Sequence, residues 1–190
     1  MNFSPVLTGR RVRLEALGLR HLPSLLNIAT SPGLRGKWPL RGRTVHPLEF
    51  GDLLYAGGSL GFAIVRIDNE DIVGLALASD LDLRSGTGTA SIMLEENLWL
   101  AGWPFEAMLL IINFLFDFIG LRRLYFQVPD YNLPKLGRGI AGWAKPEGTL
   151  SSHRYVDGSY INIHLLSLDA GAWDFELVGR ITGRTSMTPP

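Results

Sequence analysis

The segment from Thr87 to Gly120 most constrains what this chain can fold into, because a strand, a glycine turn and an apolar helix follow one another there. Gly102 lets a ligand approach the backbone closely, and Pro104 suits the first turn of a helix. The unpaired N–H groups at such a helix start, together with the helix dipole, favour an anion. The segment therefore predicts either an anion site or a plain strand-turn-helix packing unit.

Composition is typical of a small globular protein. Its 190 residues, 46% of them hydrophobic, suffice for the core of one domain, which we expect over residues 1–182 with a loose tail at 183–190. The 18 basic and 18 acidic residues balance, so no surface for nucleic acid is expected. The sequence contains no cysteine, and Met1–Gly9 lacks the pattern of a signal peptide. The apolar run Met108–Ile119 is too short to span a bilayer, so we expect a cytoplasmic protein without membrane contact.

Hydrophobic periodicity and turn residues predict a mixed α/β domain. The strand patterns lie at 11–17, 60–67, 72–78, 87–94, 123–128, 149–156 and 160–168. The helical patterns lie at 19–29, 47–55 and 104–119, with weaker ones at 133–141 and 170–178. Asp157-Gly158-Ser159 is a strong hairpin signal between the last two strands.

Several short motifs, taken in their order and spacing, resemble those of the GCN5-related N-acetyltransferases (GNAT superfamily). Within the superfamily they are most similar to the branch that acetylates ribosomal-protein N-termini and small amines. The resemblance covers residues 7–175, nearly the whole chain. The motifs are Leu7–Glu15, Ile72-Val73-Gly74, Gly102–Ala107, Gly120–Leu124, Asp130–Pro134, Glu147-Gly148 and Asp157-Gly158. Each motif is weak by itself, and their order makes the match specific.

The resemblance implies an α/β (α+β mixed) fold with a mostly antiparallel, V-shaped, seven-stranded sheet and helices on both faces. The strands at 87–94 and 123–128 would splay apart and admit acetyl-CoA, or another acyl-CoA, as co-substrate. Its pantetheine would pair with the first of these strands, and its pyrophosphate would lie on the turn before the helix at 104–119. Carried over to this sequence, the cofactor-binding residues are Ile92, Met93 and Leu94 on the strand, Trp99, Gly102, Trp103 and Phe105 at the turn, and Asn132 beside the thioester arm.

The turn departs from the family pattern, which reads Arg/Gln-x-x-Gly-x-Gly/Ala. At the matching positions Trp99 replaces the cationic or amide side chain, and Pro104 offers no N–H donor. These two losses would weaken phosphate binding by about a few kcal/mol at most. Trp99 could instead lie on the adenine or cover an altered cleft.

The catalytic positions depart as well, because Thr89 and Ser91 stand where the family often carries a strand glutamate, and Lys135 replaces a common serine. No acid or base occupies a family position. The substitute catalytic candidates are Glu95, Glu96 and His164, with His153 as a further candidate. Solvated strand ends would explain the glutamates more simply, and structural hydrogen bonding would do the same for the histidines.

Two further expectations concern charges outside these candidates. Glu106 is expected to favour the start of its helix through the dipole. The four scattered histidines have no metal-ligand spacing, so no metal is expected.

Two functions remain open on sequence alone. One is an acyl-CoA-dependent N-acyltransferase that acylates the primary amine of a small molecule or a peptide N-terminus. The other is a GNAT-fold protein that has lost acetyl transfer and acts as a binding or accessory protein. The loop at 33–46 suits either an acidic acceptor or a solvated surface, because it carries Arg35, Lys37, Arg41 and Arg43. An exposed aromatic set is expected near a homodimer contact, at Trp143, Trp173 and Phe175.

Overall fold

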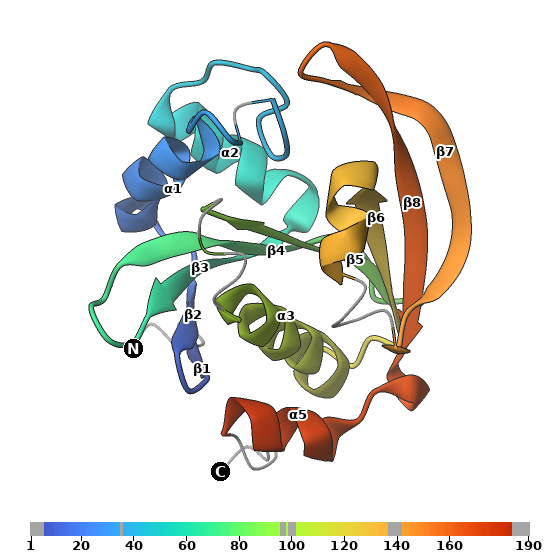
Figure 1. Ribbon diagram of the computed structural model, residues 1–190. Coiled ribbons are helices and arrows are strands. Elements are labelled where there is room, and N and C mark those ends of the chain that lie inside the picture. Colours follow the sequence, from blue (N-terminus) through green and yellow to red (C-terminus); the bar gives the residue numbers. More distant parts are fainter. Residues whose placement is uncertain (1–5, 35, 96–97, 99–101, 137–141, 184–190) are drawn as a thin grey trace.

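An eight-stranded sheet forms the centre of the molecule (Figure 1). The computed structural model describes residues 6–34, 36–95, 98, 102–136 and 142–183. The strands are β1 (Val6–Thr8), β2 (Val12–Ala16), β3 (Leu60–Arg66), β4 (Ile72–Asp82), β5 (Thr87–Leu94), β6 (Arg123–Pro129), β7 (Lys145–Val156) and β8 (Ser159–Asp169). They lie in the order β1-β2-β3-β4-β5-β6-β8-β7. Every neighbouring pair is antiparallel except β5 and β6, which run parallel.

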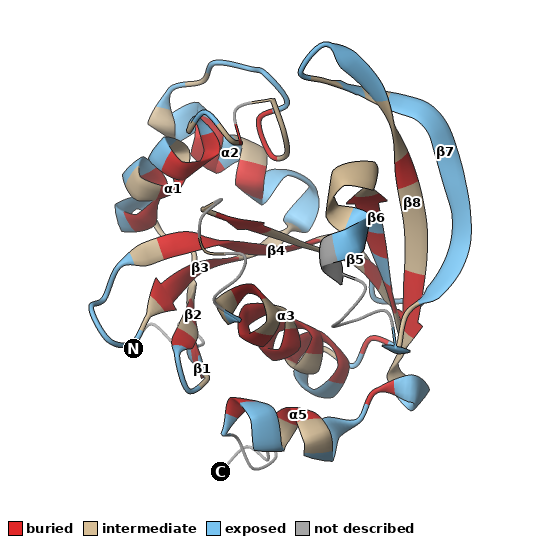
Figure 2. Cartoon of the chain, viewed as in Figure 1, coloured by how far each residue is buried: buried red, intermediate tan, exposed pale blue. Residues whose placement is uncertain are grey.

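Helices cover both faces of this sheet, as Figure 1 shows. They are α1 (Leu22–Ala29), α2 (Pro47–Tyr55), α3 (Trp103–Asn113), α4 (Leu133–Leu136) and α5 (Phe175–Thr182). α1 and α2 pack on one face, while α3 and α5 pack on the other. The buried residues gather in two clusters where these helices meet the sheet (Figure 2). The expected mixed α/β fold, with a mostly antiparallel sheet and helices on both faces, is confirmed.

The sheet has one strand more than the seven that the sequence predicted. The additional strand, β1, is three residues long and pairs Leu7 with Leu14 of β2. So short a segment gives little periodicity, and its buried residue Leu7 is flanked by two exposed ones. The pairing with β2, rather than the pattern of β1 itself, holds it in the sheet.

The middle of the sheet opens between β5 and β6. These strands pair over three residues each, Thr87–Thr89 with Arg123–Tyr125. β5 then continues to Leu94 beside β4, and β6 continues to Pro129 beside β8, with no further β5–β6 pair among the described residues. Because parallel strands point the same way, their separated carboxyl ends lie at one edge of the sheet. The predicted splaying of these two strands is confirmed.

α3 is buried almost all round because it lies between the sheet and α5. Such an environment requires apolar residues on every side of a helix, which explains the run Leu109–Ile112. The predicted helix at 104–119 is confirmed as α3 followed by a π-helical turn, Phe114–Phe118. Gly120, at φ +78°, then turns the chain into β6.

The hairpin of β7 and β8 confirms the turn prediction. Asp157 and Gly158 both have positive φ, at 47° and 88°, as a two-residue type I′ turn requires. β7 is an edge strand and is exposed along most of its length. Its pairing with β8 is interrupted by two register shifts, between Pro146 and Gly148 and between Leu150 and Arg154.

One prediction near the carboxyl end needs correction, and parts of two others lie outside the described residues. The helix expected at 170–178 is a 3-10 turn at Ala170–Ala172, followed by α5, which begins after Asp174. The Asp174 carboxylate accepts the N–H of Leu177 at 2.8 Å, and this cap sets the start of α5. The end of the predicted helix at 133–141, residues 137–141, lies outside the described residues, as does most of the predicted tail, residues 184–190.

The expected exposed aromatic set is also corrected, because Trp173 is only 5% exposed. Its ring packs edge-to-face on Trp143 and on Phe116, with centroids 5.0 Å and 6.0 Å away. Its indole N–H donates to Asn113 at 3.3 Å. Trp173 therefore closes the core beside α3 and leaves only Phe175 exposed in that set.

No helix in the described part of the chain is both long and apolar enough to cross a membrane.

Glu106 has a role that the dipole argument missed. Its carboxylate is 5% exposed and accepts the backbone N–H groups of Arg10 and Arg11 in the turn between β1 and β2. A buried carboxylate costs free energy unless it is hydrogen-bonded, and these two donors provide that compensation. Glu106 therefore fastens α3 to the start of the sheet.

We expect Glu106→Ala to lower the free energy of unfolding by about 2–4 kcal/mol, because two backbone donors lose a charged acceptor. Chemical denaturation measures this loss. Glu176→Ala is the matched control, since Glu176 is an exposed carboxylate in the first turn of α5. A dipole role alone would give both variants the same small loss, roughly 0.3–1 kcal/mol, and that equality would contradict the anchoring role.

Candidate functional site

The turn before α3 has the backbone geometry of an anion site. Gly102 caps the helix at φ +79°, a conformation that favours glycine. Trp103 and Pro104 are the first two helical residues, and the first intrahelical bond runs from the Glu106 N–H to the Gly102 carbonyl at 3.3 Å. The N–H groups of Trp103 and Phe105 precede that bond, so the helix offers them no carbonyl. The predicted turn is thus present, and the N–H groups of Trp103 and Phe105 are its backbone donors.

Two arginines lie beside this turn: Arg11 in the turn between β1 and β2, and Arg66 at the end of β3. An Nη atom of Arg11 stands 3.2 Å from where a Cβ at position 102 would lie. The Arg66 guanidinium lies over the Trp103 ring, 4.3 Å from its centroid, and also pairs with Asp68. These cations supply positive charge at the turn, where the family pattern has a cation or amide at position 99. Trp99 itself lies outside the described residues.

A motif search could not find these arginines, because they are far from Gly102 in sequence. Their proximity follows from strand pairing in the structure, because Val12 pairs with Arg66 and Arg11 therefore lies next to the end of β3. The Ile67 N–H also donates to the Arg11 carbonyl at 2.9 Å. The contact of Arg11 and Arg66 with the start of α3 forms only through tertiary packing.

The predicted strand residues Ile92, Met93 and Leu94 lie along the open part of β5. The Met93 side chain is buried under α1 and α2, and the Leu94 side chain is buried under α3. Any ligand between β5 and β6 would therefore meet mainly the backbone of these two residues. Backbone contact is what strand-like pairing with an extended ligand requires.

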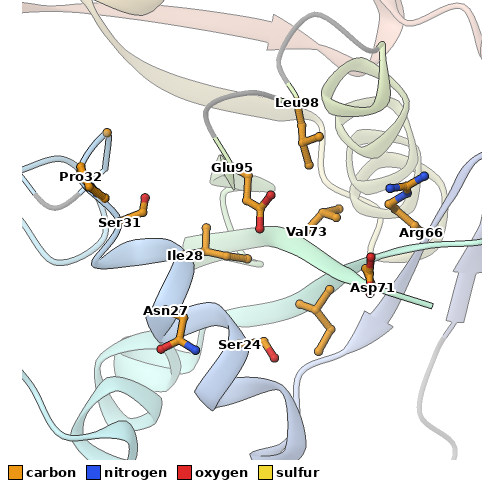
Figure 3. Close-up of a pocket in the computed structure, with 12 residues that line it drawn as sticks. Ser24, Asn27, Ile28, Ser31, Pro32, Arg66, Asp71, Val73, Glu95 and Leu98 are labelled. Atoms are coloured by element: carbon orange, nitrogen blue, oxygen red, sulfur yellow. The ribbon is translucent and has the colours of Figure 1, made fainter. Parts of the chain in front are cut away.

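A cavity of about 950 Å³ lies at the carboxyl end of β5. It is bounded by residues of α1, of the start of β4 and of the segment after β5. In Figure 3, Glu95 lies between Ser31 and Pro32 on one side and Leu98 and Arg66 on the other. Within the described residues the Glu95 carboxylate forms no hydrogen bond or ion pair. Of the catalytic candidates, Glu95 thus lines this cavity, whereas Glu96 lies outside the described residues.

A second cavity, of about 220 Å³, lies at the carboxyl end of β6. Tyr131 lines it, and Asn132, the predicted neighbour of the thioester arm, is the next residue. The loop after α1 borders both cavities, because Gly33 lines the first and Gly36 lines the second. The two cavities therefore flank the opening between β5 and β6. His153, the further base candidate, lines the second one.

His164 is held at both ring nitrogens. Nε2 lies 2.7 Å from an Asp130 carboxylate oxygen, and Nδ1 lies 3.1 Å from the Thr149 hydroxyl. Asp130 also accepts the Asn162 N–H at 2.9 Å, and this bond, followed by the one to His164, lowers the pKa of the Asp130 carboxyl. The arrangement joins the end of β6 to β7 and β8. It corresponds to the structural alternative for His164, and it does not bring His164 to Glu95.

The described residues contain no group of three His, Cys, Asp or Glu side chains that could hold a metal ion.

Comparisons with known proteins agree on the fold. No family model matches the chain. The uncharacterized N-acetyltransferase p20 of Bacillus licheniformis is 24% identical over 117 residues, which are 62% of this chain and 66% of that relative. The match thus spans slightly less than two thirds of the relative's length.

Solved structures agree over more of the chain. A GCN5-related N-acetyltransferase from Brucella melitensis has a TM-score of 0.70 at 21% identity, over 90% of this chain and 81% of its own. A chimera of the spermidine N-acetyltransferase SpeG, from Vibrio cholerae and hSSAT, has a TM-score of 0.73 at 13% identity, over 85% of this chain and 97% of its own. The class that these likenesses define is the GNAT acetyltransferase fold, and the chain has that fold.

We expect Gly102→Val to abolish CoA binding while the protein stays folded, because a branched side chain at φ +79° would face Arg11 and fill the space of the ligand. Isothermal titration with CoA measures the affinity. Gly120→Val is the matched control: its φ is +78°, and a Cβ there meets no atom within 4 Å. Equal CoA affinity in wild type and Gly102→Val would show that the ligand lies elsewhere.

Proposed function

We propose that this protein is an acyl-CoA-dependent N-acyltransferase that transfers an acetyl group to a primary amine of a small molecule or a peptide N-terminus. The observation that carries the proposal is the opening of the sheet between β5 and β6, together with the Gly102 turn at the start of α3, the helix that packs against β5. An extended thioester could lie along β5 with its phosphates at the start of α3. The shared fold supports the same assignment by analogy.

The residues of the opening fit such a ligand. The backbone of Ile92, Met93 and Leu94 would pair with the pantetheine, since β5 has no β6 partner there. The pyrophosphate would lie at Gly102, Trp103 and Phe105, with the Arg11 and Arg66 guanidinium groups beside them. Charge-assisted hydrogen bonds from arginine would offset the donors that Trp99 and Pro104 do not supply. Asn132 would stand beside the thioester arm.

Acyl transfer requires a neutral amine near the thioester carbonyl and a donor for the oxygen that becomes negative. When bound, acyl-CoA supplies the activated acyl group. This chain contributes orientation between the ends of β5 and β6, and Glu95 stands in the adjoining cavity to receive the amine proton. His164 instead holds Asp130 and thus the segment that carries Asn132.

Acetyl-CoA should stabilise the protein against heat. At a hundred times its Kd it adds about 2.7 kcal/mol, which for a domain of this size raises Tm by roughly 5–10 °C. Differential scanning fluorimetry with acetyl-CoA, longer acyl-CoAs and free CoA measures this. Absence of a shift with every one of them would refute the acyltransferase. A shift without turnover on a broad amine panel would favour a GNAT-fold binding protein.

Orientation of the amine and the thioester, and not a dedicated base, should account for most of the rate enhancement. We expect Glu95→Gln and His164→Ala each to lower kcat by less than about tenfold, whereas a dedicated base typically contributes 10²–10⁴-fold. The rate should rise with pH until the acceptor amine is neutral. Release of free CoA thiol gives kcat, and thermal melting checks the fold. A hundredfold loss at Glu95 in a folded variant would identify it as a true base and overturn this expectation.

A further inference from the structure

The cavity at the end of β6 brings together two segments that are far apart in sequence. One wall is the loop after α1, with Lys37, Trp38 and Arg41, and the other is the β7–β8 hairpin, with Arg154 and Ile161. Figure 1 shows this loop and the tip of the hairpin approaching each other above α4. The cavity is therefore a composite site, completed only when the loop packs against the hairpin.

Positive charge dominates its lining. Lys37, Arg41 and Arg154 all line the cavity, together with His153. Within the described part of the chain neither Arg41 nor Arg154 forms an ion pair, and Arg154 donates to the neutral Gln127 at 2.6 Å. Burial, followed by the positive charge of Arg41, lowers the pKa of Arg154. Two guanidinium groups that line one cavity, Arg41 exposed and Arg154 half-buried, favour an anion there.

One carboxylate lies near this cavity. Asp157, in the turn of the hairpin, has an oxygen 2.8 Å from where a Cβ at Gly36 would stand. It can offset one of the three permanent cations, so the lining keeps a net positive charge.

Aromatic rings complete the walls. Trp38, Tyr131 and Tyr155 line the cavity, and the Lys37 ammonium lies 5.1 Å from the centre of the Tyr131 ring. Such rings can pack on an aliphatic stem while the cations hold a charged end. A cavity of about 220 Å³ is smaller than the roughly 300–1,000 Å³ of sites for drug-sized ligands. Its size suits a molecule, or the terminal residue of a peptide, about as large as an amino acid.

We propose that this cavity binds the acceptor, and that the acceptor is a small primary amine carrying a carboxylate or a similar anionic group. This inference rests on the proposed acyltransferase function. Tyr131 lines the cavity and directly precedes Asn132 in the turn that follows β6, so an anion held by Arg41 and Arg154 would leave the amine to reach toward the thioester. A polyamine such as spermidine would bring positive charge against three cations.

Matched acceptors test the charge requirement. β-Alanine and β-alaninamide are nearly isosteric primary amines of which only the first carries a carboxylate, and spermidine represents a polycation. We expect kcat/KM for β-alanine to exceed that for β-alaninamide by at least tenfold, with no measurable turnover of spermidine. Peptides that begin with Glu or Gln repeat the comparison and show whether the anion belongs to a free amino acid or to a peptide N-terminus. Equal rates for acid and amide in both sets would overturn the proposal.

Matched variants locate the charge recognition. Arg41→Gln and Arg154→Gln should raise KM for the preferred acidic amine at least tenfold and leave KM for acetyl-CoA within about twofold. Arg43→Gln is the control, because Arg43 is an exposed cation of the same loop that does not line the cavity. An equal change in Arg43→Gln, or unchanged KM in both cavity variants, would contradict the assignment. Thermal melting identifies any variant that fails to fold.

Direct binding separates this inference from the proposed function. Isothermal titration with β-alanine and β-alaninamide, with and without CoA, needs no turnover. Binding of β-alanine that is lost in Arg41→Gln supports the anionic site even if acetyl-CoA neither binds nor reacts. Acetyl-CoA binding with preference for neutral or cationic amines would preserve the acyltransferase and refute the anionic acceptor. Absence of any preference for β-alanine over its amide, in rate and in binding alike, would also refute it.

Discussion

The short parallel contact between β5 and β6 is the constraint on which the rest of the structure depends. A parallel pair inside an otherwise antiparallel sheet needs a crossover, and α3 provides it on the face opposite α1 and α2. The pairing ends after three residues on each strand. The sheet is continuous where Thr87–Thr89 of β5 pair with Arg123–Tyr125 of β6, and beyond these residues it separates into two parts. Each of the two strands keeps an antiparallel partner, β4 for β5 and β8 for β6, so both stay paired on one side where they separate.

Two buried contacts hold this opening rigid. Leu94 and Met93 are adjacent on β5, and their side chains are buried in the two clusters on opposite faces of the sheet. This packing resists rotation of the strand about its own axis. Glu106 ties the first turns of α3 to the backbone between β1 and β2, which keeps Arg11 close to Gly102. A site that relies on backbone donors and orientation needs such rigidity, because small displacements of a reacting group reduce the rate steeply.

The sequence predicted most of the fold, since the strand alternation, the Gly102 turn and the Asp157-Gly158 hairpin are local features. β1 was not predicted because its three residues show almost no periodicity. The dipole argument for Glu106 did not include its hydrogen-bond donors, because they lie some 95 residues away in the sequence. Arg11, Arg66 and Arg154 reach their places through tertiary packing, which no single-sequence pattern records. His164 could be ranked as a base or a structural residue only once Asp130 and Thr149 were placed around it.

The irregular pairing of β7 has a consequence for solubility. β7 is a twelve-residue strand at the edge of the sheet, and a long, flat, exposed edge is a template on which another chain can add a strand. Here the edge carries Pro146, two breaks in register and Ser152 in a left-handed conformation at φ 48°. A neighbouring strand would find no uninterrupted ladder of donors and acceptors. At the other edge β1 is only three residues long. Neither exposed edge of the sheet therefore offers a long, regular strand to which another chain could pair and start aggregation.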